Sequence, residues 1–178
     1  MRRLILLRHA KSDWPGNVSD IDRPLNARGA AAAPRVGAYV ASEGLHPAHV
    51  MVSPARRTVM TWEAVRPHLR GLEAEIVPSI YESSRNRLLA AVRSAPDTAD
   101  SLLLIGHNPG LQDLAEHLIG AGSRRARMAL AEKFPTAALA VIDVETRSWS
   151  GITPGAGRLE RFVTPRALAE ADGAPRAD

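Results

Sequence analysis

Two histidines, each placed directly after an apolar run, are the residues of this sequence best suited to chemistry. His9 follows Arg8 and the apolar residues 4–7, and His107 follows Gly106 and the apolar residues 102–105. Each run predicts a buried strand, and ligands of open α/β sheets bind at the carboxyl ends of the strands. A neutral imidazole there can act as a covalent nucleophile, with Arg8 to hold a phosphate. Arg8 and His9 alone would equally well mark a strand that reaches the surface.

A second arginine is predicted to face the same edge from the start of a helix. After a short strand at Val50–Val52, we expect Ser53 to be the N-cap and Pro54 the first residue of this helix. Arg57 would then share a face with Ser53 and reach back towards the strand ends, where its planar set of donors suits a phosphate. Arg56 would point about 100° away. Taken alone, such a pair is more often exposed on a solvated helix.

The elements that must position these residues alternate between helix and strand. Helices are predicted at residues 27–43 with Asn26 as N-cap and a kink or late start at Pro34, around Leu88, and at 109–119 with Asn108 as N-cap and Pro109 as the first residue. Further strands are predicted at 76–77 and at 138–144, the latter paired with 149–152 or 159–163. This alternation predicts an α/β fold, a three-layer α/β/α sandwich with a mainly parallel central sheet.

The length of 178 residues points to one domain. We expect a single domain at residues 1–164 and a flexible C-terminal tail at 165–178, which is rich in Ala, Glu, Asp and Pro. No apolar run reaches the roughly 20 residues needed to span a bilayer. We therefore expect a cytoplasmic protein without a membrane partner.

The composition excludes several classes of function. Zero cysteines rule out disulfides, thiolate metal sites and phosphatases with a cysteine nucleophile. The formal charge of +4 favours anionic ligands, but 4% aromatic residues and no dense basic run argue against a nucleic-acid surface. Neither a P-loop nor a metal-ligand spacing is found, so we expect no metal and no cofactor. His46, His49 and His68 are interpreted as ordinary surface residues.

Three motifs, in this order and spacing, resemble the histidine phosphatase superfamily, also called the phosphoglycerate mutase-like family. They are Leu7-Arg-His-Ala10, Ser53-x-x-x-Arg57-x-x-x-Thr61 and Gly106-His-Asn-Pro109. The short chain and the stretches at 8–12, 22–25 and 133–136 are more similar to the SixA-type protein-histidine phosphatases. The resemblance implies a phosphoglycerate mutase-like fold, transient phosphorylation of His9, and a phosphate pocket formed by Arg8, Arg57 and His107.

The residue types indicate how such a site would work. Neutral His9 would attack phosphorus in line, and water would then cleave the phosphohistidine. Arg8, Arg57 and a protonated His107 would surround the non-bridging oxygens and offset their charge in the transition state.

A general acid is harder to assign. Ester-cleaving members of the superfamily have an acidic side chain near the position of Glu82, which would either approach the pocket or remain a solvated loop residue. Asp22 is a poorer candidate because an Asp near a turn commonly makes local hydrogen bonds. Asn108, Lys11 and Ser12 are candidates for further substrate contacts, but Lys11 and Ser12 would equally suit solvent.

The substrate class is predicted from a short connection. Larger members of the superfamily insert a long segment after the acidic position, whereas here the helix around Leu88 follows Glu82 almost at once. An open pocket would admit a phosphorylated side chain of another protein, and a P–N bond needs less help from an acid. The leading hypothesis is a phosphatase for phosphohistidine on a protein phosphotransfer domain. The alternatives are a phosphatase for small phosphate monoesters and a phosphate-binding regulatory module without turnover.

Overall fold

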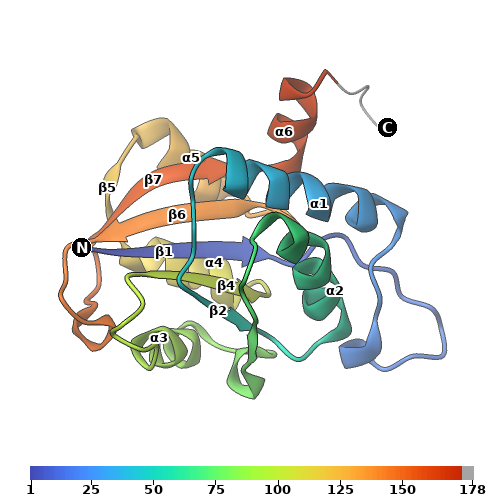
Figure 1. Cartoon of the computed structure of the whole chain (residues 1–178), viewed down its shortest axis with the longest axis horizontal. Helices are drawn as coiled ribbons and strands as arrows, with labels where there is room; N and C mark the ends of the chain where they lie inside the picture. The colour runs from blue at the N-terminus through green and yellow to red at the C-terminus, as the bar shows by residue number, and fades with distance from the viewer. Residues whose placement is uncertain (174–178) are drawn as a thin grey trace.

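In the computed structural model, which describes residues 1–173, the described strands form one seven-stranded sheet with helices on both faces (Figure 1). The strands are β1 (Arg2–Arg8), β2 (His49–Val52), β3 (Glu75–Ile76), β4 (Ser101–Gly106), β5 (Ile119–Gly122), β6 (Leu139–Val144) and β7 (Gly157–Val163). Their order across the sheet is β3-β2-β4-β1-β6-β7-β5. Both β1 and β7 pair antiparallel with β6, and the other described pairs are parallel. The prediction of a mainly parallel sheet is confirmed.

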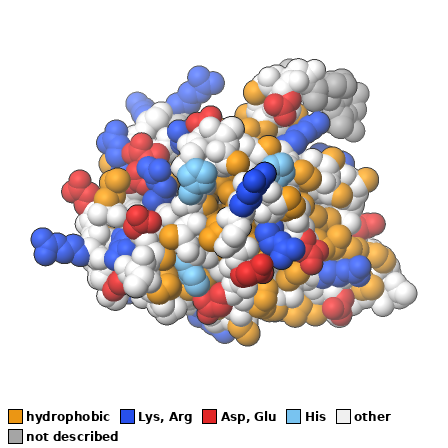
Figure 2. Space-filling model, in the orientation of Figure 1, with side chains coloured by type: hydrophobic (Ala, Val, Ile, Leu, Met, Phe, Trp, Pro, Cys, Tyr) orange, Lys and Arg blue, Asp and Glu red, His pale blue; other side chains and the backbone are white. Residues whose placement is uncertain are grey.

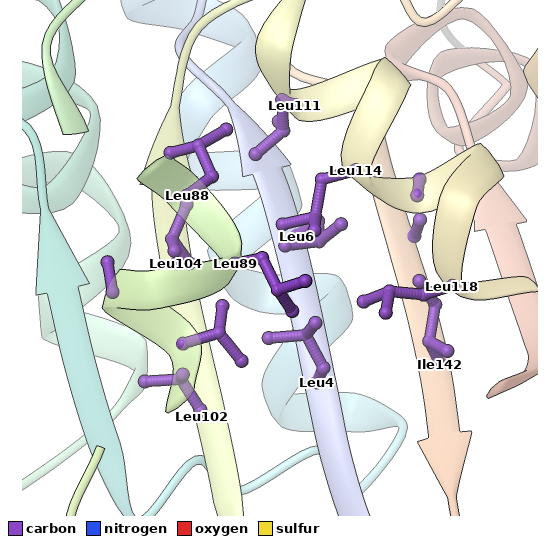
Figure 3. Close-up of a cluster of buried hydrophobic side chains, with 14 of the residues drawn as sticks. Leu4, Leu6, Leu88, Leu89, Leu102, Leu104, Leu111, Leu114, Leu118 and Ile142 are labelled. Atoms are coloured by element: carbon purple, nitrogen blue, oxygen red, sulfur yellow. The ribbon is translucent and has the colours of Figure 1, made fainter. Parts of the chain in front are cut away.

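Two apolar clusters, one on each face of the sheet, hold the helices in place. The described helices are α1 (Ala27–Ser42), α2 (Arg56–Val65), α3 (Arg85–Arg93), α4 (Gly110–Leu118), α5 (Arg124–Glu132) and α6 (Pro165–Ala171). Side chains alternate along a strand, so Leu4 and Leu6 join the cluster of α3, α4 and α5, while Ile5 and Leu7 join that of α1, α2 and α6. Figure 3 shows Leu4 and Leu6 against the leucines of α3 and α4. This confirms the three-layer α/β/α sandwich.

The pairing of β1 with β4 brings the two histidines to the same level. These parallel strands align Leu4 with Leu102 and Arg8 with Gly106. All six residues of β4 are buried, which explains its continuous apolar run. His9 and His107 therefore leave neighbouring strands side by side, as the strand-end argument predicts.

The helix starts agree with the sequence at one position and differ at others. Asn26 caps α1, with its side chain accepting a hydrogen bond from the amide of Gly29, and Pro34 lies inside this helix, so a late start at Pro34 is wrong. The prediction that Ser53 caps α2 is also wrong, because α2 begins at Arg56 after Ala55. The Ser53 hydroxyl instead contacts a histidine ring across the sheet edge.

The start of α4 is shifted as well. This helix begins at Gly110 with Pro109 as its N-cap residue, so Asn108 is not the N-cap and Pro109 is not the first helical residue. The Asn108–Pro109 peptide bond is cis. The Asn108 side chain accepts a long hydrogen bond of 3.3 Å from the amide of Gln112 and donates to the carbonyl of Phe134.

The C-terminal half contains elements that the sequence did not predict. β6 pairs with β7, whereas residues 149–151 form a short 3-10 helix, so the second of the two proposed pairings is correct. Strand β5 contains two glycines, and helix α5 buries only Leu130, so neither shows a clear apolar pattern. Helix α6 occupies the first part of the predicted tail, with Leu168 packed against the cluster of α1 and α2. Residues 174–178 lie outside the described part.

The surface seen in Figure 2 mixes basic and acidic side chains over the strands and helices, without a continuous basic stripe on that face. In the part of the chain that the structure describes, no helix combines the length and apolar character needed to cross a membrane.

Candidate active site

His9 is held in the orientation that a nucleophile needs. Its amide donates to the carbonyl of Gly106, and its ring Nδ1 lies 2.7 Å from the carbonyl oxygen of Ala10. A carbonyl only accepts hydrogen bonds, so Nδ1 carries the proton, and in the neutral ring Nε2 keeps its lone pair. His9 as a whole is 7% exposed. His9 is therefore a buried imidazole with one nitrogen fixed as donor and the other available to attack.

Burial and nearby cations keep this ring neutral. Desolvation lowers the pKa of His9 to about 4, and the charges of Arg57 and Arg8 act in the same direction, against the opposing hydrogen bond to Ala10. At neutral pH, His9 is thus in the form that can attack phosphorus.

The position of this loop depends on α2. The amide of Ala10 donates to the hydroxyl oxygen of Thr61 at 3.0 Å, and that hydroxyl donates to the carbonyl of Arg57. Gly29 of α1 lies against the backbone of Lys11, where a Cβ atom would come within 2.1 Å of the Lys11 oxygen. Two helices, α2 and α1, therefore hold the loop at the residues directly after His9.

His107 lies beside His9 and is held by Ser53. The two ring centroids are 5.2 Å apart, and Nε2 of His107 is 2.7 Å from the Ser53 hydroxyl oxygen. Desolvation, followed by the charges of His9 and Arg57, lowers the pKa of His107 to about 3. In the free pocket His107 is therefore neutral, because burial and the neighbouring charges disfavour a second cation. Its protonation in the presence of a phosphate stays a prediction.

A neutral His107 can still donate a hydrogen bond to an anion. If the hydroxyl of Ser53 donates to Nε2, the ring proton lies on Nδ1. Nδ1 is buried and has no hydrogen-bond partner among the described residues. Among the described residues, the other buried side-chain nitrogen without a hydrogen-bond partner is Nε of Arg8, which is always a donor. Unpaired buried donors are costly, so each of these nitrogens is a candidate donor to an anionic oxygen.

The two arginines of the site are held by backbone oxygens. Arg8 donates through Nη1 to the carbonyl of Phe134 at 2.9 Å, and its pKa is lowered by burial and by the charge of Arg57. Arg57 is 6% exposed, whereas Arg56 is exposed to solvent. The predicted contrast between the adjacent arginines is therefore seen, although α2 starts later than expected.

An acidic residue that the sequence analysis did not consider joins the site. Asp20, from the loop after β1, accepts hydrogen bonds from Arg57 on its backbone oxygen and carboxylate, from the hydroxyl of Tyr81 at 2.6 Å, and from Arg23 at 3.1 Å. The bond from Tyr81, with those from the arginines, lowers the pKa of Asp20 to about 2. Burial and the same bond raise the pKa of Tyr81 to about 12. Asp20 thus links the loop to α2 and to the segment before α3.

Asp22, the poorer candidate for the general acid, makes a local hydrogen bond. It is exposed, and its carboxylate accepts a hydrogen bond from the hydroxyl of Ser19 at 2.6 Å. Asp20 and Asp22 lie two positions apart in the same loop, and no local sequence pattern shows which of them contacts the site. Only the path of the loop turns Asp20 towards Arg57.

The other candidates lie around this centre in different roles. Asn108 donates to the carbonyl of Phe134, the same oxygen that Arg8 uses. The hydroxyl of Ser12 accepts a hydrogen bond from Arg23, while Lys11 is exposed without a side-chain partner among the described residues. The structure thus brings Asn108 next to Arg8 and gives Ser12 a contact within the loop.

Glu82 lies at the edge of the site. It is exposed, has a positive φ of 47°, and follows Tyr81, whose ring centroid is 5.7 Å from that of His107. The charge of Glu82 contributes to the raised pKa of Tyr81, after burial and Asp20. A role for Glu82 as proton donor stays a prediction.

Among the described residues, no group of three or more His, Asp or Glu side chains is arranged to hold a metal ion.

The comparison with known proteins agrees with this geometry. The family model of the histidine phosphatase superfamily (branch 1) matches residues 4–88. An uncharacterized chloroplastic protein of Arabidopsis thaliana is 32% identical over 182 residues, covering 92% of this chain and 78% of the relative. An uncharacterized protein of Mycobacterium tuberculosis is 30% identical over 164 residues, covering 90% of this chain and all of the relative.

Two solved structures, both provisionally assigned as the phosphohistidine phosphatase SixA, have the same fold. The one from Agrobacterium tumefaciens has a TM-score of 0.78 and 29% identity, covering 92% of this chain and 98% of that one. The one from Nakamurella multipartitia has a TM-score of 0.79 and 26% identity, covering 92% and 96%. The fold and the family match together define a phosphatase of the histidine phosphatase type. The chain belongs to the histidine phosphatase superfamily, and it shares its fold with these two structures.

Proposed function

We propose that this protein removes phosphate from phosphohistidine on another protein, by way of a phosphoryl group carried on His9. The observation that carries this proposal is the state of the His9 ring. Its Nδ1–H is fixed by Ala10 at 2.7 Å, and its Nε2 is left as a neutral nucleophile beside the cations Arg8 and Arg57.

In the first step, Nε2 of His9 forms a bond to phosphorus while the bond from phosphorus to the substrate imidazole breaks on the opposite side. The departing imidazole leaves as a neutral ring when its other nitrogen is already protonated, so it needs little help from an acid. In the second step, water attacks the phosphoryl group, the bond to His9 breaks, and inorganic phosphate leaves. The water proton passes to solvent or to the phosphate.

The surrounding donors stabilise the charge that develops on the non-bridging oxygens. Nε of Arg8 and Nδ1 of His107 are the buried nitrogens available for this purpose. Arg57 would exchange part of its contact with Asp20 for a phosphate oxygen. Such donors are in place before the reaction starts, which lowers the cost of reorganisation.

The short connection between Tyr81 and α3 supports a protein substrate. Only residues 82–84 separate Tyr81 from the first residue of α3, so no long inserted segment at this position can cover a small molecule. The names of the solved structures from Agrobacterium tumefaciens and Nakamurella multipartitia also point to phosphohistidine as substrate. A cytoplasmic location and the absence of nucleic-acid binding belong to the same proposal.

The test is a phosphohistidine assay combined with trapping of the intermediate. We expect His9→Ala to abolish release of phosphate from a phosphohistidine protein and to abolish the acid-labile, base-stable label that rapid quenching leaves on the enzyme. His46→Ala, at an exposed histidine, is the control and should keep both. Turnover by His9→Ala at the level of the unmodified protein would rule out the proposed nucleophile. Binding of phosphate without any turnover would favour the regulatory module instead.

A second candidate function is hydrolysis of small phosphate monoesters, and Glu82 is the observation that favours it. An alkoxide leaves poorly without a proton, so an ester needs an acid more than a phosphohistidine does. If Glu82 supplies that proton, Glu82→Gln should lower kcat for an alkyl phosphate at least tenfold and change phosphohistidine hydrolysis by less than twofold. Equal small effects on both substrates would leave Glu82 without a catalytic part.

A further inference from the structure

A groove of about 1000 Å³ runs between α1, α5 and α6 on the side of the molecule next to the active site. Figure 1 shows α6 standing beside α1, with the loop after β1 leading away from the same region. The groove begins at Lys11, two residues beyond the nucleophile, and ends at α6.

The chain segment that lines one side of this groove also contacts the end of β1 and His9. Residues 135–137 line the groove, while the carbonyl of Phe134 binds Arg8 and the amide of Ala137 donates to the carbonyls of Arg8 and His9. A partner that lies in the groove would thus be separated from the phosphate pocket by a single stretch of chain. This distance suits a contact made by the same protein that presents its phosphorylated side chain to His9.

The groove carries an excess of positive charge. Arg28 and Arg35 of α1, together with Lys11 and Lys133, have no ion pair within the described part of the chain. Arg166 is paired with Glu170 within α6 at 3.1 Å, and Glu132 is the remaining acid of the lining. A protein segment with acidic side chains is therefore the complementary ligand.

Several small side chains line the groove between these cations. Arg28, Ala32 and Arg35 have the spacing of one helical face, and Ala129 of α5 and Ala169 of α6 face the groove from the other elements. Small side chains allow close approach of another helix, and an amphipathic helix in a groove is a common form of recognition. A helix with acidic residues one to two turns apart could place its apolar stripe on the alanines and its carboxylates near the arginines.

We propose that this groove binds an acidic amphipathic helix of the phosphorylated partner protein, and so selects which phosphohistidine reaches His9. This inference rests on the proposed function. It assigns substrate choice to residues outside the phosphate pocket, and it predicts that small substrates, which do not reach the groove, are indifferent to it.

The experiment reverses the charge of the groove with the double variant Arg28→Glu, Arg35→Glu. The control is the single charge reversal Arg147→Glu, at an exposed arginine that follows β6 at the opposite end of the strands. The probe is a helical phosphotransfer domain with glutamates on the helix next to its histidine, phosphorylated with phosphoramidate. A second probe is the same domain with these glutamates replaced by glutamine.

For the acidic probe, we expect the double variant to lose at least tenfold in kcat/KM through a higher KM, and the control variant to lose less than twofold. Hydrolysis of p-nitrophenyl phosphate should stay within twofold for both variants. The glutamine probe should be a poor substrate and should not distinguish the variants. Equal kcat/KM for the acidic probe in all three proteins would overturn the groove as a docking site.

Binding of the unphosphorylated acidic domain, measured by fluorescence anisotropy, separates this inference from the proposed function. If the domain binds, and the double variant weakens that binding tenfold, the groove is a docking site even where no phosphohistidine is cleaved. If phosphohistidine is cleaved but binding and cleavage are the same in the double variant, the function holds and the groove inference fails. Absence of binding to the unmodified protein also counts against the groove.

Discussion

Arg57 donates two hydrogen bonds to Asp20, one to the backbone oxygen at 2.7 Å and one to the carboxylate at 3.1 Å. The carboxylate therefore occupies part of the donor set that a phosphate would use, while the backbone contact orients the guanidinium. Asp20 therefore has two opposite effects on phosphate binding: its carboxylate competes with phosphate for Arg57, and its backbone oxygen positions Arg57 for phosphate. Substitutions of Asp20 and Arg57 distinguish these effects.

Removing the negative charge of Asp20 should tighten phosphate binding. We expect Asp20→Asn to lower the inhibition constant of inorganic phosphate about fivefold, a change of about 1 kcal/mol for one charge near the site in a solvated setting. The amide oxygen of Asn can still accept from Arg57, so the orientation is largely kept. Asp22→Asn is the matched control, because Asp22 is exposed and bonds only to Ser19 among the described residues. Weaker phosphate binding by Asp20→Asn would show that positioning outweighs competition.

The adjacent arginines offer an internal comparison. Arg57→Ala should reduce kcat/KM by roughly thirty- to a thousandfold, or about 2 to 4 kcal/mol, by analogy with the loss of one oxyanion donor. It also leaves the carboxylate of Asp20 facing the incoming phosphate. Arg56→Ala should change kcat/KM severalfold at most, since this side chain is exposed. Lys at position 57 should restore activity only in part, because an ammonium lacks the planar fork. Comparable losses at both positions would contradict the assigned pocket.

The titration of the two active-site histidines should be shifted far below the ordinary value. The pKa of His9 is lowered to about 4 and that of His107 to about 3, in both cases first by burial. At pH 5, about 90% of His9 should still be neutral, against about 3% for a ring with a pKa of 6.5. The measurement is an NMR titration of the ring protons, with His9→Gln to assign the signals. Midpoints near 6.5 would contradict the buried, neutral pair.

The same shifts predict how stability depends on pH. Between pH 6.5 and about 4, the unfolded chain takes up protons on these histidines while the folded protein does not. Their contribution to the free energy of unfolding is therefore fully present above pH 6.5 and is lost progressively as the pH falls towards 4. Denaturant unfolding of the unmodified protein and of His107→Gln over this range should show a smaller loss in the variant.

The activity should not depend on a divalent cation. Arg8 and Arg57 supply the positive charge that a metal ion supplies in other phosphatases, so we expect full turnover after exhaustive EDTA treatment. Vanadate, whose trigonal form resembles the transferring phosphoryl group, should inhibit under the same conditions. An activity that EDTA removes and added magnesium or zinc restores would show that this expectation is wrong.

Local patterns in the sequence were enough to predict the strands and residues that form the centre of the site. Apolar runs predicted β1 and β4, and the residues directly after them identified His9 and His107 as neighbours, because parallel strands end at the same edge of a sheet. The helical spacing after Ser53 predicted that Arg57 faces the site and that Arg56 faces elsewhere. The later start of α2 does not change this difference, because adjacent residues of a helix point in different directions.

The tertiary structure alone decided the contacts between distant segments. Asp20 and Arg57 are 37 positions apart and Ser53 and His107 are 54 apart, so no local propensity could pair them. Serine is a favoured N-cap residue, so the sequence predicted that Ser53 caps α2. In the structure the Ser53 hydroxyl is hydrogen-bonded to the buried ring of His107 instead, and this long-range bond outweighs the local preference for capping. Asp20 and Asp22 are chemically alike, and the path of the loop across α2 is what makes one of them part of the site.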